Sequence, residues 1–154
     1  MKTNPNAVRI VKCATMFLKG DAKTVFSLLC PVKEADWIKE WVDICTIVYT
    51  KSGIAEEACV FETDVPDEGH SLWICSHYDA DKCTITYIKH IVGKAVVKWD
   101  MHVRDTADGS AIDSVYNMTS LSEEGVAFVK NYDETYFTVL MDGLQKQIND
   151  YVTR

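Results

Sequence analysis

The residues of this chain best suited to chemistry are one histidine, two cysteines near it and several tyrosines. His77 lies near the end of a predicted strand, and a turn centred on Ala80 would set it opposite Cys83, with Cys75 two positions away on the same side. An imidazole titrates near neutral pH, so His77 is a candidate general acid or base on the inner face of the sheet. The simpler interpretation is a histidine at the mouth of the sheet.

A zinc site built from these residues is not expected. Structural zinc sites generally use paired ligands at C-x2–4-C spacing, and no such spacing occurs here. The sequence also lacks a nucleotide-binding loop, a nucleophile elbow and the spacing of a catalytic triad. We therefore predict no metal and no cofactor. In an enzyme, His77 would act with a tyrosine such as Tyr87 or Tyr116.

The elements that must position these residues follow from the spacing of apolar side chains. Val8 to Leu18 alternates as a first strand, Asp21 can cap a short helix over Ala22 to Leu29, and a second short helix follows around Glu34 to Ile38. From Ile44 onward, runs of β-branched and aromatic residues are separated by turn signals, which predicts six further antiparallel strands. These signals are Ser52-Gly53, Pro66 to Gly69, Asp79 to Asp81, Gly93-Lys94 and Asp108-Gly109.

The last part of the chain changes from a period of two to a helical period. Apolar residues recur at three- and four-residue intervals from Val126 to Tyr151, which predicts one long helix with an apolar face. Such a helix can bury that face only against the sheet. The sequence therefore predicts an α+β fold in which a curved antiparallel sheet of about seven strands wraps around a long C-terminal helix, with two short helices after the first strand.

Turn chemistry gives a strand register. The Asp108-Gly109 turn would set Trp99 against Met118, the next turns back would set Tyr87 beside Trp99 and Trp73 beside Tyr87, and the hairpin at Asp67 would set Phe61 against Trp73. The predicted inward row is Phe61, Trp73, Tyr87, Trp99 and Met118. The same register places Cys59 against Cys75 on the inner face. On the outer face it places Arg104 against Asp113 and His70 against His90, and it turns His102 outward.

Several further residues allow two interpretations. Trp37 and Trp41 could cover the mouth of a cavity or anchor the short helices on the sheet. Gly143 could make room inside the long helix or lie toward solvent. The acidic pairs Asp67-Glu68 and Glu123-Glu124 fall in a turn and at the start of the last helix, where we expect them to be solvated.

Composition excludes several classes of protein. The chain has 154 residues, 47% of them apolar, which is enough for a single domain spanning residues 1–154 with a sizeable core. A net charge of −7 and scattered lysines argue against nucleic acid as a partner. No apolar run is long enough to span a bilayer and no signal peptide is apparent, so we expect a cytoplasmic protein, with its six cysteines reduced and without integral membrane association. A homodimer is left open.

Four segments of the chain resemble bacterial members of the SRPBCC superfamily. They are Val25 to Trp41, Val60 to Thr63, Ser71 to Asp79 and Tyr116 to Gly125. This helix-grip fold is shared by START lipid-transfer domains, the birch-pollen allergen and aromatic polyketide cyclases. The resemblance covers nearly the whole chain and implies a cavity between sheet and helix that holds a lipid, a polyketide or another small hydrophobic molecule.

The inward aromatic residues and the resemblance together predict a ligand-binding cavity rather than a solid core. The expected ligand-binding residues are Phe61, Trp73, Tyr87, Trp99, Met101, Tyr116, Met118, Tyr136, Phe137 and Leu140. Binding or transport of a small hydrophobic ligand is the leading hypothesis. The alternatives are a cyclase- or dehydratase-like enzyme, and an interaction protein similar to chaperone activators of this fold, which would use the outer face of the sheet.

Overall fold

A seven-stranded antiparallel sheet forms the frame of the molecule. The computed structural model describes residues 1–154, and the sheet order is β1-β7-β6-β5-β4-β3-β2. The strands are β1 (Arg9–Leu18), β2 (Cys45–Tyr49), β3 (Val60–Val65), β4 (Gly69–Asp79), β5 (Thr84–Ile91), β6 (Ala95–Thr106) and β7 (Gly109–Ser120). The helices are α1 (Ala22–Leu28), η1 (Glu34–Asp36), α2 (Trp41–Ile44), η2 (Pro66–Glu68), α3 (Glu123–Asn131) and α4 (Glu134–Val152). The predicted fold class is confirmed.

The C-terminal helix differs from the prediction because it is broken in two. α3 ends at Asn131 and α4 begins at Glu134. Asp133 adopts an extended backbone and its side chain accepts a hydrogen bond from the Tyr136 amide at 2.9 Å, so it caps a new helix. The apolar period continues through this break, and periodicity alone therefore could not reveal it.

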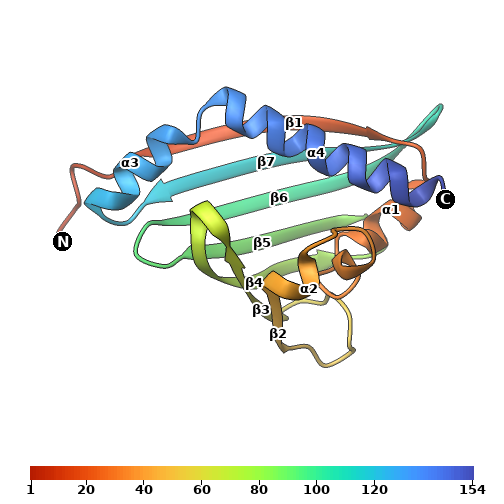
Figure 1. Ribbon diagram of the computed structural model, residues 1–154, viewed down its shortest axis with the longest axis horizontal. Coiled ribbons are helices and arrows are strands. Elements are labelled where there is room, and N and C mark those ends of the chain that lie inside the picture. Colours follow the sequence, from red (N-terminus) through yellow and green to blue (C-terminus); the bar gives the residue numbers. More distant parts are fainter.

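Helix α4 covers the edge strand β1 as well as the inner face of the sheet. In Figure 1, α4 lies along β1 and β7 and ends beside α1, at the end of the molecule opposite the N-terminus. Gln145 accepts a hydrogen bond from the Phe17 amide at 2.7 Å, and Asn149 bonds both the Phe17 carbonyl and the Lys19 amide. These side chains satisfy backbone groups that an edge strand would otherwise expose.

One glycine permits the helix to approach the sheet. At Gly125 a Cβ atom would lie 1.8 Å from the carbonyl oxygen of Lys94, in the turn between β5 and β6. The same carbonyl accepts a hydrogen bond from the Leu121 amide at 2.8 Å. Any side chain at Gly125 would force α3 away from the sheet.

The β6–β7 hairpin is shifted by two residues from the predicted register. Thr106 pairs with Gly109, so Trp99 faces Tyr116 rather than Met118. Asp113 consequently pairs with His102, and it still reaches Arg104 diagonally at 2.6 Å. Because side chains alternate with a period of two, a shift of two residues changes the partners but keeps every residue on its predicted face.

A β-bulge in β4 corrects the prediction for His77. The register shifts between Cys75 and His77, so Cys75 pairs with Tyr87 and His77 with Thr86, not with Cys83. Trp73 accordingly pairs with Lys89. The bulge inserts one residue and turns His77 to the outer face, where it is exposed.

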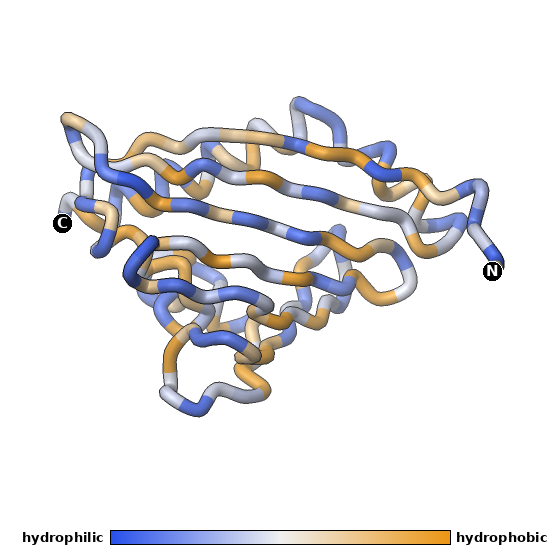
Figure 2. The backbone as a smooth tube through the Cα atoms, turned by 180° about the vertical axis from the view of Figure 1, so that it is seen from behind, coloured by the Kyte–Doolittle hydropathy of each residue, from blue (hydrophilic) through white to orange (hydrophobic).

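The outer face of the sheet is mixed in character. In Figure 2, hydrophilic and hydrophobic residues alternate along the strands, as expected when successive side chains point to opposite faces. The outward residues nevertheless include the exposed apolar side chains of Leu72, Ile74 and Val115. His70, His90 and His102 are exposed there, as predicted, although His90 pairs with Leu72 rather than His70. None of the helices combines the length and the apolar character that crossing a membrane requires.

Cys59 and Cys75 are neighbours across β3 and β4, as the register predicted. The Cys75 amide donates to the Cys59 carbonyl at 3.0 Å. All six cysteines are free thiols, and four of them are buried in the core.

Candidate ligand-binding cavity

A cavity of about 180 Å³ lies between the inner face of the sheet, the α1–α2 segment and α4. Seventeen of its twenty lining residues are apolar or aromatic. Strands β3 to β7 form its floor, the segment from Leu29 to Trp41 closes one side, and α4 closes the other with Leu140, Leu144 and Ile148. Tyr136 lines the cavity although it is half exposed, so the cavity approaches the surface at the start of α4.

The structure brings together most of the residues that the sequence predicted for ligand binding. Those that line the cavity are Phe61, Trp73, Tyr87, Trp99, Met101, Tyr116, Tyr136 and Leu140. Met118 and Phe137 are buried but do not line it. Met118 faces Val97 because of the two-residue shift, and Phe137 packs on the rings of Tyr116 and Tyr132.

The aromatic rings of the wall are anchored by their polar atoms. Trp73 donates to Thr63 Oγ1 at 2.9 Å, Trp99 to Ser114 Oγ at 2.6 Å, and the Tyr87 hydroxyl to the Leu29 carbonyl at 2.9 Å. Because these polar atoms already have partners, the rings present apolar faces to the cavity. Phe61 stacks on Trp73 with ring centroids 5.2 Å apart, which makes one continuous aromatic wall.

Trp37 and Trp41 are held by hydrogen bonds to the backbone around the end of α1. Their indole nitrogens donate to the carbonyls of Leu28, the last residue of α1, at 3.1 Å and of Pro31 at 2.6 Å. Both rings also line the cavity. They do not share one helix, since η1 ends at Asp36 and α2 begins at Trp41.

A buried ion pair lies in the wall, where the sequence analysis placed only a solvated turn. Lys89 of β5 and Glu68 of η2 form a salt bridge, and both side chains are almost completely inaccessible to solvent. The Lys89 ammonium also lies 4.6 Å from the centre of the Trp73 ring. Burial lowers the pKa of Lys89, while the carboxylate of Glu68 acts in the opposite direction.

Glu34 is the third charged residue of the lining, and its carboxyl group has no partner. Its backbone is fixed in η1, where the Glu34 amide donates to the Cys30 carbonyl at 2.8 Å. Burial alone raises the pKa of Glu34 to about 8. Glu34 is half-buried and is one of the residues that line the cavity. Burial and, to a smaller extent, the charge of Glu34 raise the pKa of the Cys45 thiol to about 12.

Tyrosines supply the remaining polar groups of the cavity. Tyr116 of β7 and Tyr132 between the last two helices are stacked with ring centroids 5.4 Å apart. Tyr136 packs on Tyr132 with ring centroids 4.7 Å apart. Burial raises the pKa of all three phenols, so they remain protonated hydrogen-bond donors at neutral pH.

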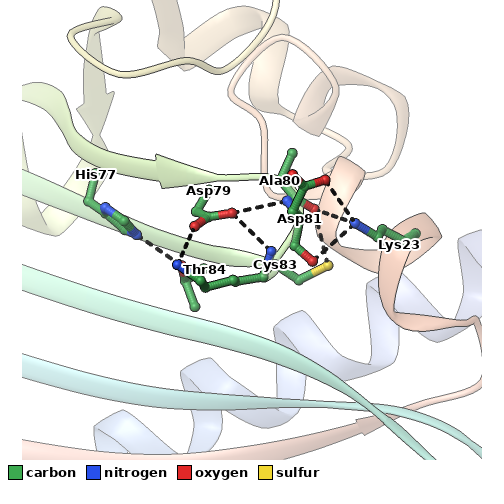
Figure 3. Close-up of polar contacts among 8 residues, drawn as sticks. Lys23, His77, Asp79, Ala80, Asp81, Cys83 and Thr84 are labelled. Carbon is green, nitrogen blue, oxygen red and sulfur yellow. Dashed lines mark hydrogen bonds and ion pairs between the residues drawn. The ribbon is translucent and has the colours of Figure 1, made fainter.

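His77 lies outside this cavity. Figure 3 shows it at the β4–β5 hairpin, pointing toward Thr84, with its Nε2 atom 2.9 Å from Thr84 Oγ1. In the same hairpin, Lys23 of α1 donates to the Ala80 carbonyl at 2.6 Å, and the Cys83 thiol to the same carbonyl at 3.7 Å. These contacts tie α1 to the turn. No group of three or more histidine, cysteine, aspartate and glutamate side chains is placed to hold a metal ion.

Sequence reasoning missed the three charged residues of the lining. Lys89 could have been found, because it alternates with the inward residues Tyr87 and Ile91 of its strand. Glu68 and Glu34 lie in single turns of 3-10 helix, where no period indicates which side faces the cavity.

Comparison with known proteins gives the fold. No family model matches the chain, and no curated protein matches its sequence. Three similar solved structures are an uncharacterized protein from Rhizobium leguminosarum, norcoclaurine synthase from Thalictrum flavum in complex with dopamine and hydroxybenzaldehyde, and Ara h 8.0201. Their identities are 11%, 15% and 16%, and their TM-scores are 0.69, 0.67 and 0.61. The matches cover 96%, 92% and 96% of this chain, and 97%, 87% and 98% of the respective neighbours. The chain therefore has the helix-grip fold that its sequence resemblance implied.

Proposed function

We propose that this protein binds a small, largely aromatic molecule in the cavity between the sheet and α4. The observation that carries the proposal is a cavity of about 180 Å³ whose lining is apolar or aromatic in seventeen of twenty residues. An engineered apolar cavity of roughly 150 Å³ is enough to bind benzene. A single ring with a short substituent matches the space, whereas a long lipid chain would require α4 or the α1–α2 segment to move.

The test is binding of indole and toluene, measured by isothermal titration calorimetry. We expect dissociation constants of about 1 mM or lower, equivalent to at least roughly −4 kcal/mol. Leu144→Trp places a larger ring in the cavity and should weaken both probes by about tenfold or more. Val139→Trp is the matched control, since Val139 is exposed on the same helix. Absence of binding by the unmodified protein would contradict the proposal.

An acid–base enzyme is the second candidate, and Glu34 is the observation that favours it. A general acid or base works best when its pKa lies near the working pH, and burial brings the pKa of Glu34 to about 8. Glu34 thus replaces His77 as the candidate for this role. Norcoclaurine synthase, whose solved structure is similar to this chain, is an example of an enzyme with this fold.

This second candidate predicts proton abstraction from a bound ketone. Acetophenone in deuterated buffer should exchange its methyl protons faster with the protein than without it, as measured by NMR. The excess rate should rise with pH around 8 and disappear in Glu34→Gln. Equal exchange with the unmodified protein and the variant would leave only the binding function.

A further inference from the structure

The charges in the cavity do not balance. Three charged side chains line it, and Lys89 and Glu68 neutralise each other in an ion pair. Glu34 is left over, with no cation near enough to pair with it and burial as the sole cause of its raised pKa. A buried carboxyl without a partner is unfavourable when charged, so a ligand that supplies a positive charge would relieve a cost that the empty protein carries.

The same wall shows how this cavity holds an ammonium group. The Lys89 amine has a carboxylate on one side and the face of Trp73 at 4.6 Å on the other. Contact with an aromatic face stabilises a cation that has lost its water. Glu34 offers the carboxylate half of that arrangement in a lining that it shares with Tyr87 and Phe61, whose rings pack edge-on with centroids 5.6 Å apart.

We infer that the ligand is an arylalkylamine, whose ring occupies the aromatic part of the cavity and whose ammonium group pairs with the carboxylate of Glu34. This inference rests on the proposed binding function and specifies its ligand. The size of the cavity favours one ring with a chain of two or three atoms over a larger amine.

Pairing with an ammonium group requires Glu34 to be ionised, which links binding to pH. In the empty protein Glu34 is protonated below about pH 8. Binding of an ammonium ion then releases a proton, so the affinity should rise up to about tenfold per pH unit from pH 6 to 8 and level off above that. A neutral ligand of the same shape should show no such rise.

The other titratable groups that face the cavity do not produce this signature. Those that line it are Glu68, Tyr87, Lys89, Tyr116, Tyr132 and Tyr136, and the Cys45 thiol lies close enough to Glu34 to be affected by its charge. The pKa of Cys45 is about 12, and the pKa values of the four tyrosines are raised above their usual range, so these groups stay protonated up to pH 8. Lys89 and Glu68 remain paired in both the unmodified protein and a Glu34 variant, and their contribution cancels in the comparison.

The experiment compares 2-phenylethylamine with 2-phenylethanol, its neutral counterpart, by calorimetry at pH 6, 7 and 8. At pH 8 the unmodified protein should bind the amine at least about tenfold more tightly than the alcohol, and the preference should shrink toward pH 6. Titrations in two buffers of different ionisation enthalpy should detect the released proton at pH 7. Glu34→Gln should abolish the preference and retain alcohol binding, whereas Glu40→Gln, an exposed carboxylate of the same segment, should change neither.

Each outcome supports or overturns one statement. Equal binding of amine and alcohol at pH 8, or a preference that survives Glu34→Gln, overturns the amine inference and leaves the binding function in place. If neither probe binds, and indole and toluene also fail, the binding function itself is wrong. Alcohol binding by the Glu34→Gln variant shows that its cavity is intact.

Discussion

Replacing Glu34 with glutamine should stabilise the protein in a pH-dependent way. Glutamine has nearly the same shape as a protonated glutamic acid but cannot ionise. The ordinary pKa of this carboxyl is 4.5, and burial raises it to about 8 in the folded protein. Between these values the folded state holds a proton that the unfolded state has released, so stability is complete below pH 4.5 and falls as the pH rises toward 8.

The size of the effect follows from the size of the shift. One pKa unit corresponds to about 1.4 kcal/mol, so a shift from 4.5 to about 8 sets an upper limit near 5 kcal/mol. Glu34 is only half-buried, so solvent screening reduces this limit and we expect about 3 kcal/mol at pH 8.5. At pH 5 the variant and the unmodified protein should differ by less than about 1 kcal/mol.

Urea unfolding at pH 5 and pH 8.5 measures both numbers. The slope of the free energy against urea should be the same for the two proteins, because the surface exposed on unfolding is unchanged. Other groups that titrate in this interval are present in both proteins, so their contributions to the pH dependence cancel. Glu40→Gln should show no pH-dependent gain. A difference between Glu34→Gln and the unmodified protein that stays constant from pH 5 to 8.5 would refute the placement of this carboxyl.

Three further predictions concern stability. Lys89→Met should cost about 3–5 kcal/mol in urea unfolding, because it leaves the carboxylate of Glu68 buried and unpaired. Lys89→Met combined with Glu68→Leu should recover most of this loss. A loss below about 1 kcal/mol for the single change would mean that the pair is hydrated. Gly143→Ala should stabilise the protein by up to about 1 kcal/mol, seen as a higher Tm by circular dichroism, because a Cβ there meets open space; a lower Tm would mean that α4 packs closely at this position. Asp113→Ala should cost less than about 1 kcal/mol in urea unfolding, since its pair with Arg104 is exposed. A loss of several kcal/mol would contradict the placement of Asp113 on the outer face of the sheet.

The alternation of side chains made the sheet predictable from the sequence. Six hairpin strands and their inward faces followed from turns and apolar spacing, and the faces survived even where the partners were wrong. Trp99 was expected opposite Met118 and lies opposite Tyr116, yet both candidates point inward because the error was two residues. A two-residue error in a turn therefore keeps each residue on its predicted face but moves it along the strand, so Met118 is buried inside without lining the cavity.

A one-residue irregularity has the opposite consequence. The bulge between Cys75 and His77 reverses the face of every residue after it in β4, and this removed the strongest catalytic candidate from the cavity. Nothing in the turn after Asp79 signals the bulge. The break between α3 and α4 is similar, because Asp133 acts as a cap only when the chain there leaves the helix.

The charged residues of the cavity lining favour the proposed binding site over an ordinary core. A core of this size could be built from the seventeen apolar and aromatic residues alone, and the packing of the wall rings shows that they are well ordered by their own hydrogen bonds. Lys89 and Glu68 form a buried ion pair, and such pairs contribute little net stability compared with apolar residues of the same size. The unpaired carboxyl of Glu34 actively disfavours the folded state above pH 4.5. A polar group that costs stability and faces an open cavity is explained by what it contacts when the cavity is filled, and for a carboxylate among aromatic rings that contact is a cation.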